Sequence, residues 1–457
     1  MIMCVKRYYL LITLYMCNFF LVSCYLDENK DAGPVDNLAT PPNVDSQGEE
    51  NVVLWWTPFT GIQGQSRTCS VGTCFFTENR NVVNEKTTKA VLFYGSDFNV
   101  EDLPLPRPLS QWWGVLHEES PKNQPLFDHD PVLKLFNVTS TFRRNSSFPL
   151  TLQHLVSIDI LTSTDEYFTL TEKTLFSERD DLAPIIYVQS DCDTPAERDN
   201  FVQELSKLIK IDSYGRCLHN RDLPLHLQDA AATYDHTDFR KLVSKYKFAL
   251  AIENAACDDY ITEKLWRPLS VGTIPIYWGS PSIIDWVPNP KSIIHIRDFD
   301  SPVELAQYLY AVLQNDTLYE SFLEHKEKGM VSNTNLIKSM DDRKWGINND
   351  FERGNFIEHF ECHVCDEILR GFNSQRKQAD SSHYGCPEPP SVLTGQPNPK
   401  SFWVEEWHKA RVEAQVLHRF VSTKPGVFTS DQFFQEVIDR LQKDGFFSRF
   451  LHVHEDL

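Results

Sequence analysis

The chain is short of positive charge. Its 457 residues carry 44 lysines and arginines against 64 aspartates and glutamates, which gives a formal net charge of −20. Binding to a nucleic-acid backbone needs a basic surface, so a general nucleic-acid-binding role is excluded. An anionic small molecule stays open as a ligand wherever a few lysines and arginines gather locally. The chain also lacks an evident internal repeat, so a repeat architecture is not expected.

Hydrophobic side chains are plentiful. Hydrophobic residues make up 41% of the chain and aromatic residues 12%, with 10 tryptophans. This composition is typical of a globular protein rather than a disordered one. The length is enough for two or three domains with cores of their own.

The amino end predicts a membrane anchor. Lys6 and Arg7 precede an uncharged run of 19 residues at 8–26. The run suits either a cleaved signal peptide or an uncleaved signal-anchor. Its length approaches the ~20 residues that span a bilayer, and the basic residues before it favour a cytosolic amino terminus. We therefore expect a cytosolic tail and signal-anchor at 1–26 and a flexible stem at 27–50, with the rest of the chain lumenal.

Features of the lumenal part agree with the secretory pathway. We expect a single-pass type II membrane protein of the Golgi or the endoplasmic reticulum. The carboxyl-terminal His454-Glu-Asp-Leu457 is a scrambled retrieval signal, which points to the endoplasmic reticulum. N-glycosylation sequons begin at Asn137, Asn145 and Asn315.

Eight cysteines remain beyond the anchor, and an even number in an oxidising lumen predicts disulfides. Two short spacings, Cys362-x2-Cys365 and His383-x2-Cys386, would also suit a tetrahedral zinc ion. The oxidising compartment favours disulfides over zinc.

Strand-like and helical patterns alternate along the chain. Strands are expected at 52–56, 90–95, 185–190, 248–252, 273–278 and 292–296, and helices at 197–210, from Thr262 onward, and at 303–313, 403–420 and 430–451. The alternation predicts an α/β fold whose parallel sheet is covered on both faces, with ligands beyond the carboxyl ends of the strands. The expected divisions are an amino-terminal domain at 51–178, a ligand-binding domain at 179–345 and a carboxyl-terminal extension at 346–457, helical and cysteine-containing.

The segment 248–267 carries the strongest functional signal. An apolar strand ends at Glu253 and Asn254, and a helix begins near Thr262, followed by Lys264. A helix start offers backbone N–H groups and the positive end of the macrodipole to a phosphate. Lys264 is therefore a candidate phosphate ligand, as is Arg198, which follows the strand 185–190. Both could instead be solvated helix charges.

A second cluster lies in the amino-terminal domain. Trp112 and Trp113 precede Glu118 and Glu119 and a Ser-Pro turn. A carboxylate beside aromatic surface can have a raised pKa and serve as a general base, although the tryptophans could equally be core residues.

Two acid pairs, Asp191-Cys-Asp193 and Asp128-His-Asp130, resemble those that hold Mn²⁺ in metal-dependent transferases. Patterns of three residues are frequent by chance, and we expect no metal at either.

These residues resemble the α1,3-fucosyltransferases of glycosyltransferase family ten, which have the GT-B fold of two Rossmann-like domains facing a cleft. The likeness is carried by Ile252-Glu-Asn254, by Asp259-Tyr-Ile-Thr-Glu-Lys-Leu-Trp266 and by the Gly-x-Ile-Pro-Ile-x-x-Gly-x-Pro run at 272–281. It covers roughly residues 54–366. Arg267-Pro268 and the long extension resemble a divergent animal branch, linked to O-fucosylation of protein domains of the EMI type.

The resemblance implies GDP-fucose as donor. Arg198 and Lys264 would face the diphosphate, and Asn254, Tyr260 and Glu263 would surround the ribose and fucose.

The resemblance also selects Glu119 over Glu118 as the base, because family members carry Glu-Ser-Pro at this place. It implies a one-step inverting transfer without metal or other cofactor. Cys362 and Cys365 would pair with Cys69 and Cys74.

The acceptor stays open between N-acetylglucosamine of a glycoprotein and a Ser or Thr hydroxyl of a lumenal protein domain, and the branch likeness favours protein. The alternatives are an inactive lumenal protein that binds a nucleotide sugar, and a metal-dependent glycosyltransferase.

Overall fold

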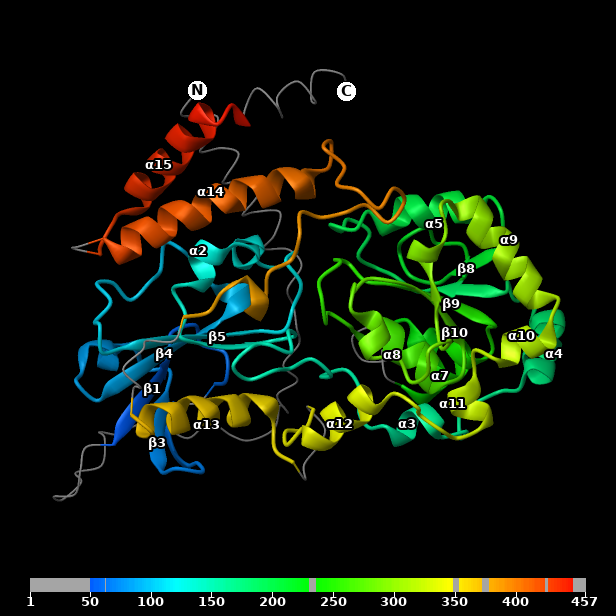
Figure 1. Cartoon of the computed structure of the whole chain (residues 1–457), viewed down its shortest axis with the longest axis horizontal. Helices are drawn as coiled ribbons and strands as arrows, with labels where there is room; N and C mark the ends of the chain where they lie inside the picture. The colour runs from blue at the N-terminus through cyan, green and yellow to red at the C-terminus, as the bar shows by residue number, and fades with distance from the viewer. Residues whose placement is uncertain are drawn as a thin grey trace.

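The computed structural model describes residues 50–61, 63–229, 236–347, 353–371, 378–423 and 426–446. Two α/β domains lie side by side in it (Figure 1). The expected signal-anchor, most of the stem and the carboxyl-terminal tetrapeptide lie outside these residues. Among the helices of the described ranges, none combines the length and the hydropathy needed to cross a bilayer.

The first domain contains a six-stranded sheet with the order β2-β3-β1-β4-β5-β6. Its strands are β1 (Asn51–Trp55), β2 (Gln65–Thr68), β3 (Thr73–Thr77), β4 (Thr88–Tyr94), β5 (Trp112–His117) and β6 (Val138–Thr141). Only the edge strand β2 runs antiparallel to its neighbour.

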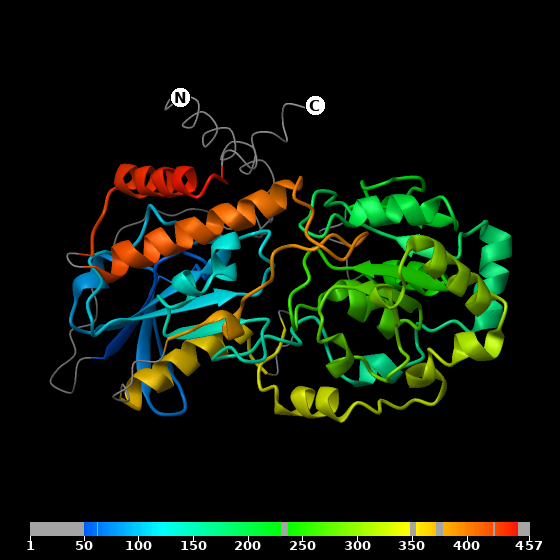
Figure 2. The same ribbon diagram turned by 45° about the horizontal axis from the view of Figure 1, so that its top comes forward.

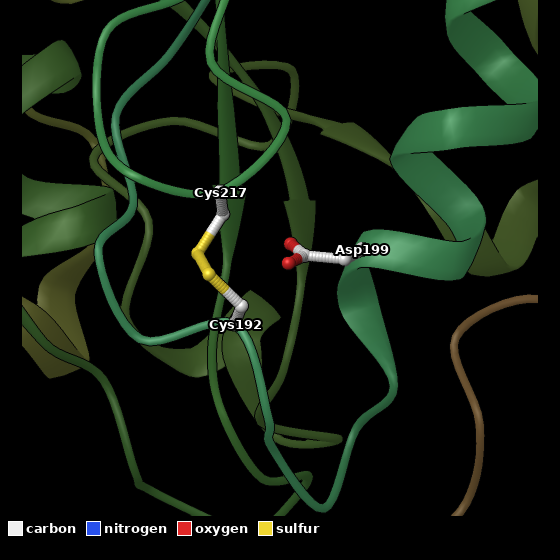
Figure 3. A group of neighbouring side chains, drawn as sticks. All are labelled: Cys192, Asp199 and Cys217. Atoms are coloured by element: carbon white, nitrogen blue, oxygen red, sulfur yellow. A yellow bond between two sulfur atoms is a disulfide. The ribbon is translucent and has the colours of Figure 1, made fainter.

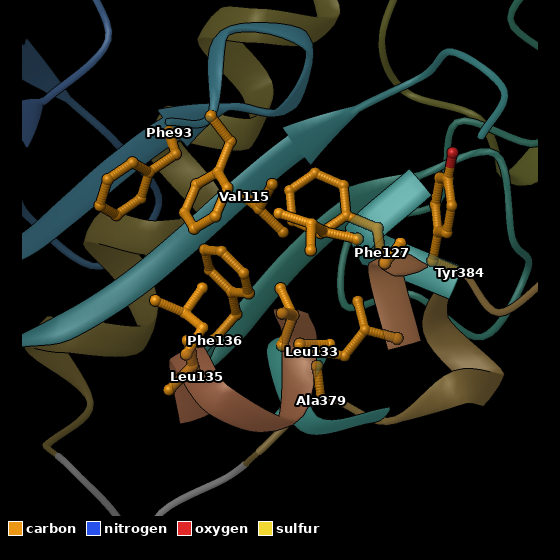
Figure 4. Packing of buried hydrophobic residues seen from close by; sticks show 14 of the residues in the cluster. Phe93, Val115, Phe127, Leu133, Leu135, Phe136, Ala379 and Tyr384 are labelled. Atoms are coloured by element: carbon orange, nitrogen blue, oxygen red, sulfur yellow. The ribbon is translucent and has the colours of Figure 1, made fainter. Parts of the chain in front are cut away.

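Helices from the carboxyl-terminal part of the chain cover both faces of this sheet. α13 (Phe356–Leu369) lies on one face, and α14 (Phe402–Ser422) and α15 (Ser430–Lys443) lie on the other (Figures 1 and 2). Successive side chains of a strand point to opposite faces. In β4, Ala90 and Leu92 therefore pack with α13. Phe93 packs on the other side, in the aromatic cluster of Figure 4.

Residues 346–457 are thus an extension in sequence but part of the first domain in space. Two disulfides, Cys69–Cys362 and Cys74–Cys365, tie α13 to the turn after β2 and to β3. The family resemblance implied that these four cysteines pair with one another, and the structure shows which cysteine pairs with which. The sulfur atoms are taken up by these bonds, which removes them from the alternative zinc site.

The second domain contains a parallel five-stranded sheet with the order β11-β10-β9-β7-β8. Its strands are β7 (Ile185–Tyr187), β8 (Ile211–Ser213), β9 (Phe248–Ile252), β10 (Ile274–Trp278) and β11 (Ile294–His295). Its longer helices are α4 (Leu170–Asp180), α5 (Arg198–Ser206), α7 (Thr237–Ser244), α8 (Glu263–Ser270), α9 (Pro302–Leu313) and α12 (Thr334–Asp342). Shorter helices are α2 (Asp130–Leu133) in the first domain, and α3 (Asp159–Thr162), α10 (Asp316–Glu320) and α11 (Glu324–Glu327). The α/β fold with parallel sheets is confirmed.

A strap formed by residues 378–401 connects the two domains (Figure 2). At its first end the Ala379 N–H donates to the Phe136 carbonyl of the first domain, 3.0 Å away. Further along, Cys386 forms a disulfide with Cys257 of the second domain. The strap then leads into α14, so both domains are bound to one continuous segment.

Candidate active site

A cleft of about 340 Å³ lies between the two domains. Its polar wall on the first domain is formed by Glu118 and Glu119, which directly follow β5. The opposite wall comes from α7 and α8 of the second domain and from residues 153–160, which lie between β6 and α8 in the chain and include the start of α3. The residues that line it there are Gln153, His154, Leu155, Val156, Ile160, Arg240, Glu263, Trp266, Arg267 and Ser270.

The start of α8 is organised around a buried carboxylate. The Thr262 hydroxyl caps the helix by accepting from the Lys264 N–H at 3.3 Å. Glu253, at the end of β9, is fully buried and accepts from the Thr262 N–H at 2.8 Å and from its hydroxyl at 2.7 Å. The strand end and the helix start are therefore held as one unit.

Lys264 brings positive charge to this unit. Its Nζ lies 3.1 Å from Glu263 Oε1 and 3.9 Å from Glu253 Oε2. Burial opposes ionisation of Glu263, but the positive charges of Lys264 and Arg267 outweigh it and hold the pKa of Glu263 well below its usual range. Glu263 is thus an ionised carboxylate. The Lys264 ammonium at the helix start is therefore paired with neighbouring carboxyl groups rather than standing alone.

The two acids of the first domain differ in their surroundings. Burial raises the pKa of Glu118 to about 7, with a further contribution from the charge of Glu119. Glu118 Oε1 accepts from the Tyr94 hydroxyl at 3.1 Å. Its Oε2 is buried and has no partner among the described residues.

Burial also raises the pKa of Glu119, while the charge of Lys264 opposes this rise and that of Glu263 adds to it. The two domains therefore act on the same carboxyl group across the cleft. A carboxyl whose pKa is raised toward neutrality is suited to exchange a proton with a substrate.

The remaining predicted donor residues lie at the carboxyl end of the second sheet. Asn254 is half-buried, and its Oδ1 has no partner among the described residues. Tyr260 is buried, and its ring packs edge-on against Phe142 of the first domain at 5.1 Å.

Arg198, which the resemblance implied would face the diphosphate, does not lie on the cleft wall. Its side chain is only 1% exposed, and the guanidinium donates to the carbonyls of Ile252, at 3.2 Å, and Asp191, at 2.7 Å. Its Nε has no partner among the described residues. The guanidinium lies beneath the loops rather than on the cleft wall.

The acid pairs considered for metal are otherwise engaged. Asp191 pairs with Lys122, and Asp193 Oδ1 accepts from the Trp403 indole at 2.7 Å. Near this pair, Asp199 lies close to Cys192 and Cys217 (Figure 3). The two cysteines form a disulfide, so they offer no free thiolates that could bind a metal ion together with Asp199. In the second pair, the buried Asp128 accepts from the Cys386 N–H at 3.3 Å.

One of the three predicted glycosylation sites is wrong. The Asn137 side chain is 4% exposed, and its Oδ1 accepts from the Trp113 N–H at 3.1 Å. A buried amide has no room for a glycan. Asn145 and Asn315 are exposed.

Sequence reasoning missed His154, Arg240 and Trp266 as parts of the cleft. Trp266 belongs to the quoted motif and its position in the first turns of α8 could have indicated the wall. His154 lies in an irregular segment, where no periodic signal exists to place it. Burial lowers the pKa of His154, so it is a neutral group in the cleft.

Two α/β domains that face each other across a cleft, with a candidate base on one and an ion-bearing helix start on the other, have the arrangement of a glycosyltransferase. Comparison with known families agrees. Residues 177–380 match the family described as "Glycosyltransferase family 10 (fucosyltransferase) C-term", and residues 48–153 match "Fucosyltransferase, N-terminal". The chain belongs to glycosyltransferase family 10, the fucosyltransferases.

Similar individual proteins were also found. The GDP-fucose protein O-fucosyltransferase 3 of Gallus gallus is 44% identical over 413 residues, which are 88% of this chain and 85% of that protein. The Homo sapiens protein of the same name is 44% identical over 84% of this chain and 81% of its own length. Among solved structures, an alpha1,3-fucosyltransferase with GDP-fucose matches with a TM-score of 0.41 and 18% identity, over 75% of this chain and 96% of that one.

Proposed function

We propose that this enzyme transfers L-fucose from GDP-fucose to a Ser or Thr hydroxyl of a lumenal protein, with inversion at the anomeric carbon. Family membership supports the donor, and the name shared by relatives that are 44% identical supports a protein acceptor. The type of acceptor domain stays a prediction. In this proposal the domains act as the two halves of a GT-B enzyme.

The single observation that carries the mechanism is that Glu119 of the first domain lines the same cleft as Glu263, whose carboxylate pairs with Lys264 at the start of α8. The charges of Lys264 and Glu263 both act on the Glu119 carboxyl. A base within reach of donor-side charges can take the acceptor proton while the hydroxyl attacks the fucose anomeric carbon. Lys264 would stabilise the charge that develops on the leaving diphosphate, a preorganised electrostatic effect.

The other donor residues have supporting roles. Asn254 has a side-chain oxygen free of partners among the described residues, and Tyr260 lies where the domains meet. Both would contact the ribose and the fucose. Arg198 would contribute positive charge from beneath the loops, where its Nε has no hydrogen-bond partner in the described part of the chain.

The location of the enzyme is part of the proposal. The described residues form four disulfides, which persist in oxidising compartments. A lumenal catalytic part in the Golgi or the endoplasmic reticulum, tethered by the segment at 8–26, accounts for them.

The test is a transfer assay with the full-length chain, GDP-fucose and two acceptors. One acceptor is a disulfide-bonded protein domain that contains Ser and Thr, and the other is a glycan that ends in N-acetylglucosamine. Mass spectrometry should locate fucose on a Ser or Thr hydroxyl. The Glu119→Gln variant keeps the shape and loses the base, so its rate should fall by ~100-fold or more. Fucose on the glycan alone, or a Glu119→Gln variant of wild-type rate, would contradict the proposal.

A further inference from the structure

Three consecutive residues of the first domain meet residues 258–260 of the second domain, at the start of the donor motif Asp259–Trp266. The ring of Phe142 packs against Tyr260, and Arg143 Nη1 lies 2.8 Å from Asp258 Oδ2. Arg144 contacts Asp259, which lies between Asp258 and Tyr260 in the sequence. These contacts join the segment after β6 to the loop that leads into α8.

The Arg144–Asp259 contact is the tightest of the three. Arg144 Nε donates to Asp259 Oδ1 at 3.0 Å, Nη2 donates to the same oxygen at 2.6 Å, and the backbone N–H donates to Oδ2 at 3.1 Å. The guanidinium also lies 4.4 Å from the ring centroid of Trp286 and 2.8 Å from Asp285 Oδ2. A guanidinium that binds with several parallel N–H groups fixes direction as well as distance.

Asp259 is itself held firmly within the second domain. Its backbone N–H donates to the hydroxyls of Ser280, at 2.8 Å, and Ser282, at 3.0 Å, and its Oδ1 accepts from the Trp286 indole at 3.0 Å. Its φ of 64° is in the left-handed region, which a non-glycine residue adopts only when its surroundings hold it there. The second domain therefore holds Asp259 in place, and Arg144 connects that fixed point to the first domain.

We propose that Arg144 is a positioning residue for fucosyl transfer: by holding Asp259 it sets the placement of the first domain, and with it Glu119, relative to the donor motif. The proposal rests on the proposed function. The reason for the proposal is that the base Glu119 belongs to the first domain and the donor-binding loop to the second, so their distance depends on how the two domains are placed. A misplacement of about 1 Å between reacting groups can lower a rate by about 100-fold.

The role predicts a separation of effects. In Arg144→Met, Asp259 keeps its partners in the second domain, so donor binding should survive. The placement of Glu119 relative to the donor should be lost. We expect kcat for transfer to fall at least about tenfold, while the GDP affinity measured by calorimetry changes by less than about threefold.

Matched variants separate positioning from a general loss of stability. Arg179→Met removes an exposed arginine from α4, which pairs with its neighbour Asp180, and should leave transfer unchanged. If Arg144→Met fails to fold, charge exchange at the adjacent pair decides. Arg143→Asp and Asp258→Arg alone should each lower transfer, and the two together should restore it.

Each outcome decides between the alternatives. Wild-type kcat in Arg144→Met, a fall in GDP affinity that matches the fall in kcat, or a double exchange that restores nothing would overturn the positioning role. If the wild-type chain transfers no fucose, the proposed function fails instead. Hydrogen exchange of the peptide 255–263 then tests, without turnover, whether Arg144 holds Asp259 in place. Faster exchange of this peptide in Arg144→Met supports that role, and unchanged exchange refutes it.

Discussion

Replacing Glu118 by Gln should change the pH dependence of stability in a defined direction. The glutamine keeps the shape of the side chain and can still accept from the Tyr94 hydroxyl, but it does not ionise. Burial, together with the charge of Glu119, raises the pKa of Glu118 from 4.5 to about 7. The folded chain therefore binds this proton more tightly than the unfolded chain does.

The sign follows from this difference. Below pH 4.5 the carboxyl is protonated in both states and costs nothing. As the pH rises from 4.5 to about 7, the unfolded chain ionises first, so the folded state loses stability relative to Glu118→Gln. At about 1.4 kcal/mol for each tenfold change in proton affinity, the loss reaches about 3 kcal/mol above pH 7 as an upper limit.

The assay is urea unfolding of the oxidised wild-type and Glu118→Gln proteins at several pH values between 4.5 and 8. The difference in the free energy of unfolding should grow with pH in favour of Glu118→Gln and level off above pH 7. Glu101, which is exposed, serves as the control, and its replacement by Gln should give no such trend. A constant difference for Glu118→Gln across the range would refute the reasoning.

Three further outcomes are expected. Lys264→Ala should weaken GDP binding at least about tenfold in calorimetry, because a charge-assisted contact to the diphosphate is lost; unchanged affinity would remove Lys264 from the donor site. Asn145→Gln and Asn315→Gln should each lower the mass of the secreted or lumenal protein by one glycan, whereas Asn137→Gln should not. A loss of mass in Asn137→Gln would contradict the burial of Asn137. Transfer should keep its rate in EDTA, and a loss that Mn²⁺ restores would favour a metal-dependent enzyme.

Local patterns predicted the second domain well. The strand β9 has the bounds that its apolar run predicted, and α8 starts after Thr262 as expected. The strand at 185–190 is shorter than predicted because its last residues bond elsewhere. The Gln189 carbonyl accepts from the Cys217 N–H at 3.0 Å, within a loop fixed by the Cys192–Cys217 disulfide. A hydrophobic run shows where a strand lies, but not where its hydrogen bonds leave the sheet.

The first domain was harder to predict because its core is assembled from distant segments. The periodicity at 403–420 and 430–451 indicated α14 and α15, but periodicity does not tell which sheet a helix covers. The helix α13 was not predicted. The same limit applies to the site. Glu119 and the α8 motif were both predicted, the former through the family resemblance, whereas Arg144 carries no local signal: its role arises only where the segment after β6 meets Asp259 in space.

The placement of α13 has a consequence for the order of events during synthesis. Cys69, which follows β2, and Cys74 of β3 find their partners 293 and 291 residues later in the chain. At roughly 5–20 residues per second, about 15 to 60 seconds pass before those partners leave the ribosome. In that interval the second domain can complete its own sheet, while the earlier sheet lacks the carboxyl-terminal helices that cover its two faces and has two unpaired thiols. The second domain can thus fold before the first domain is complete, although the first domain is synthesised earlier. A chain cut short before residue 356 would leave the first sheet without α13.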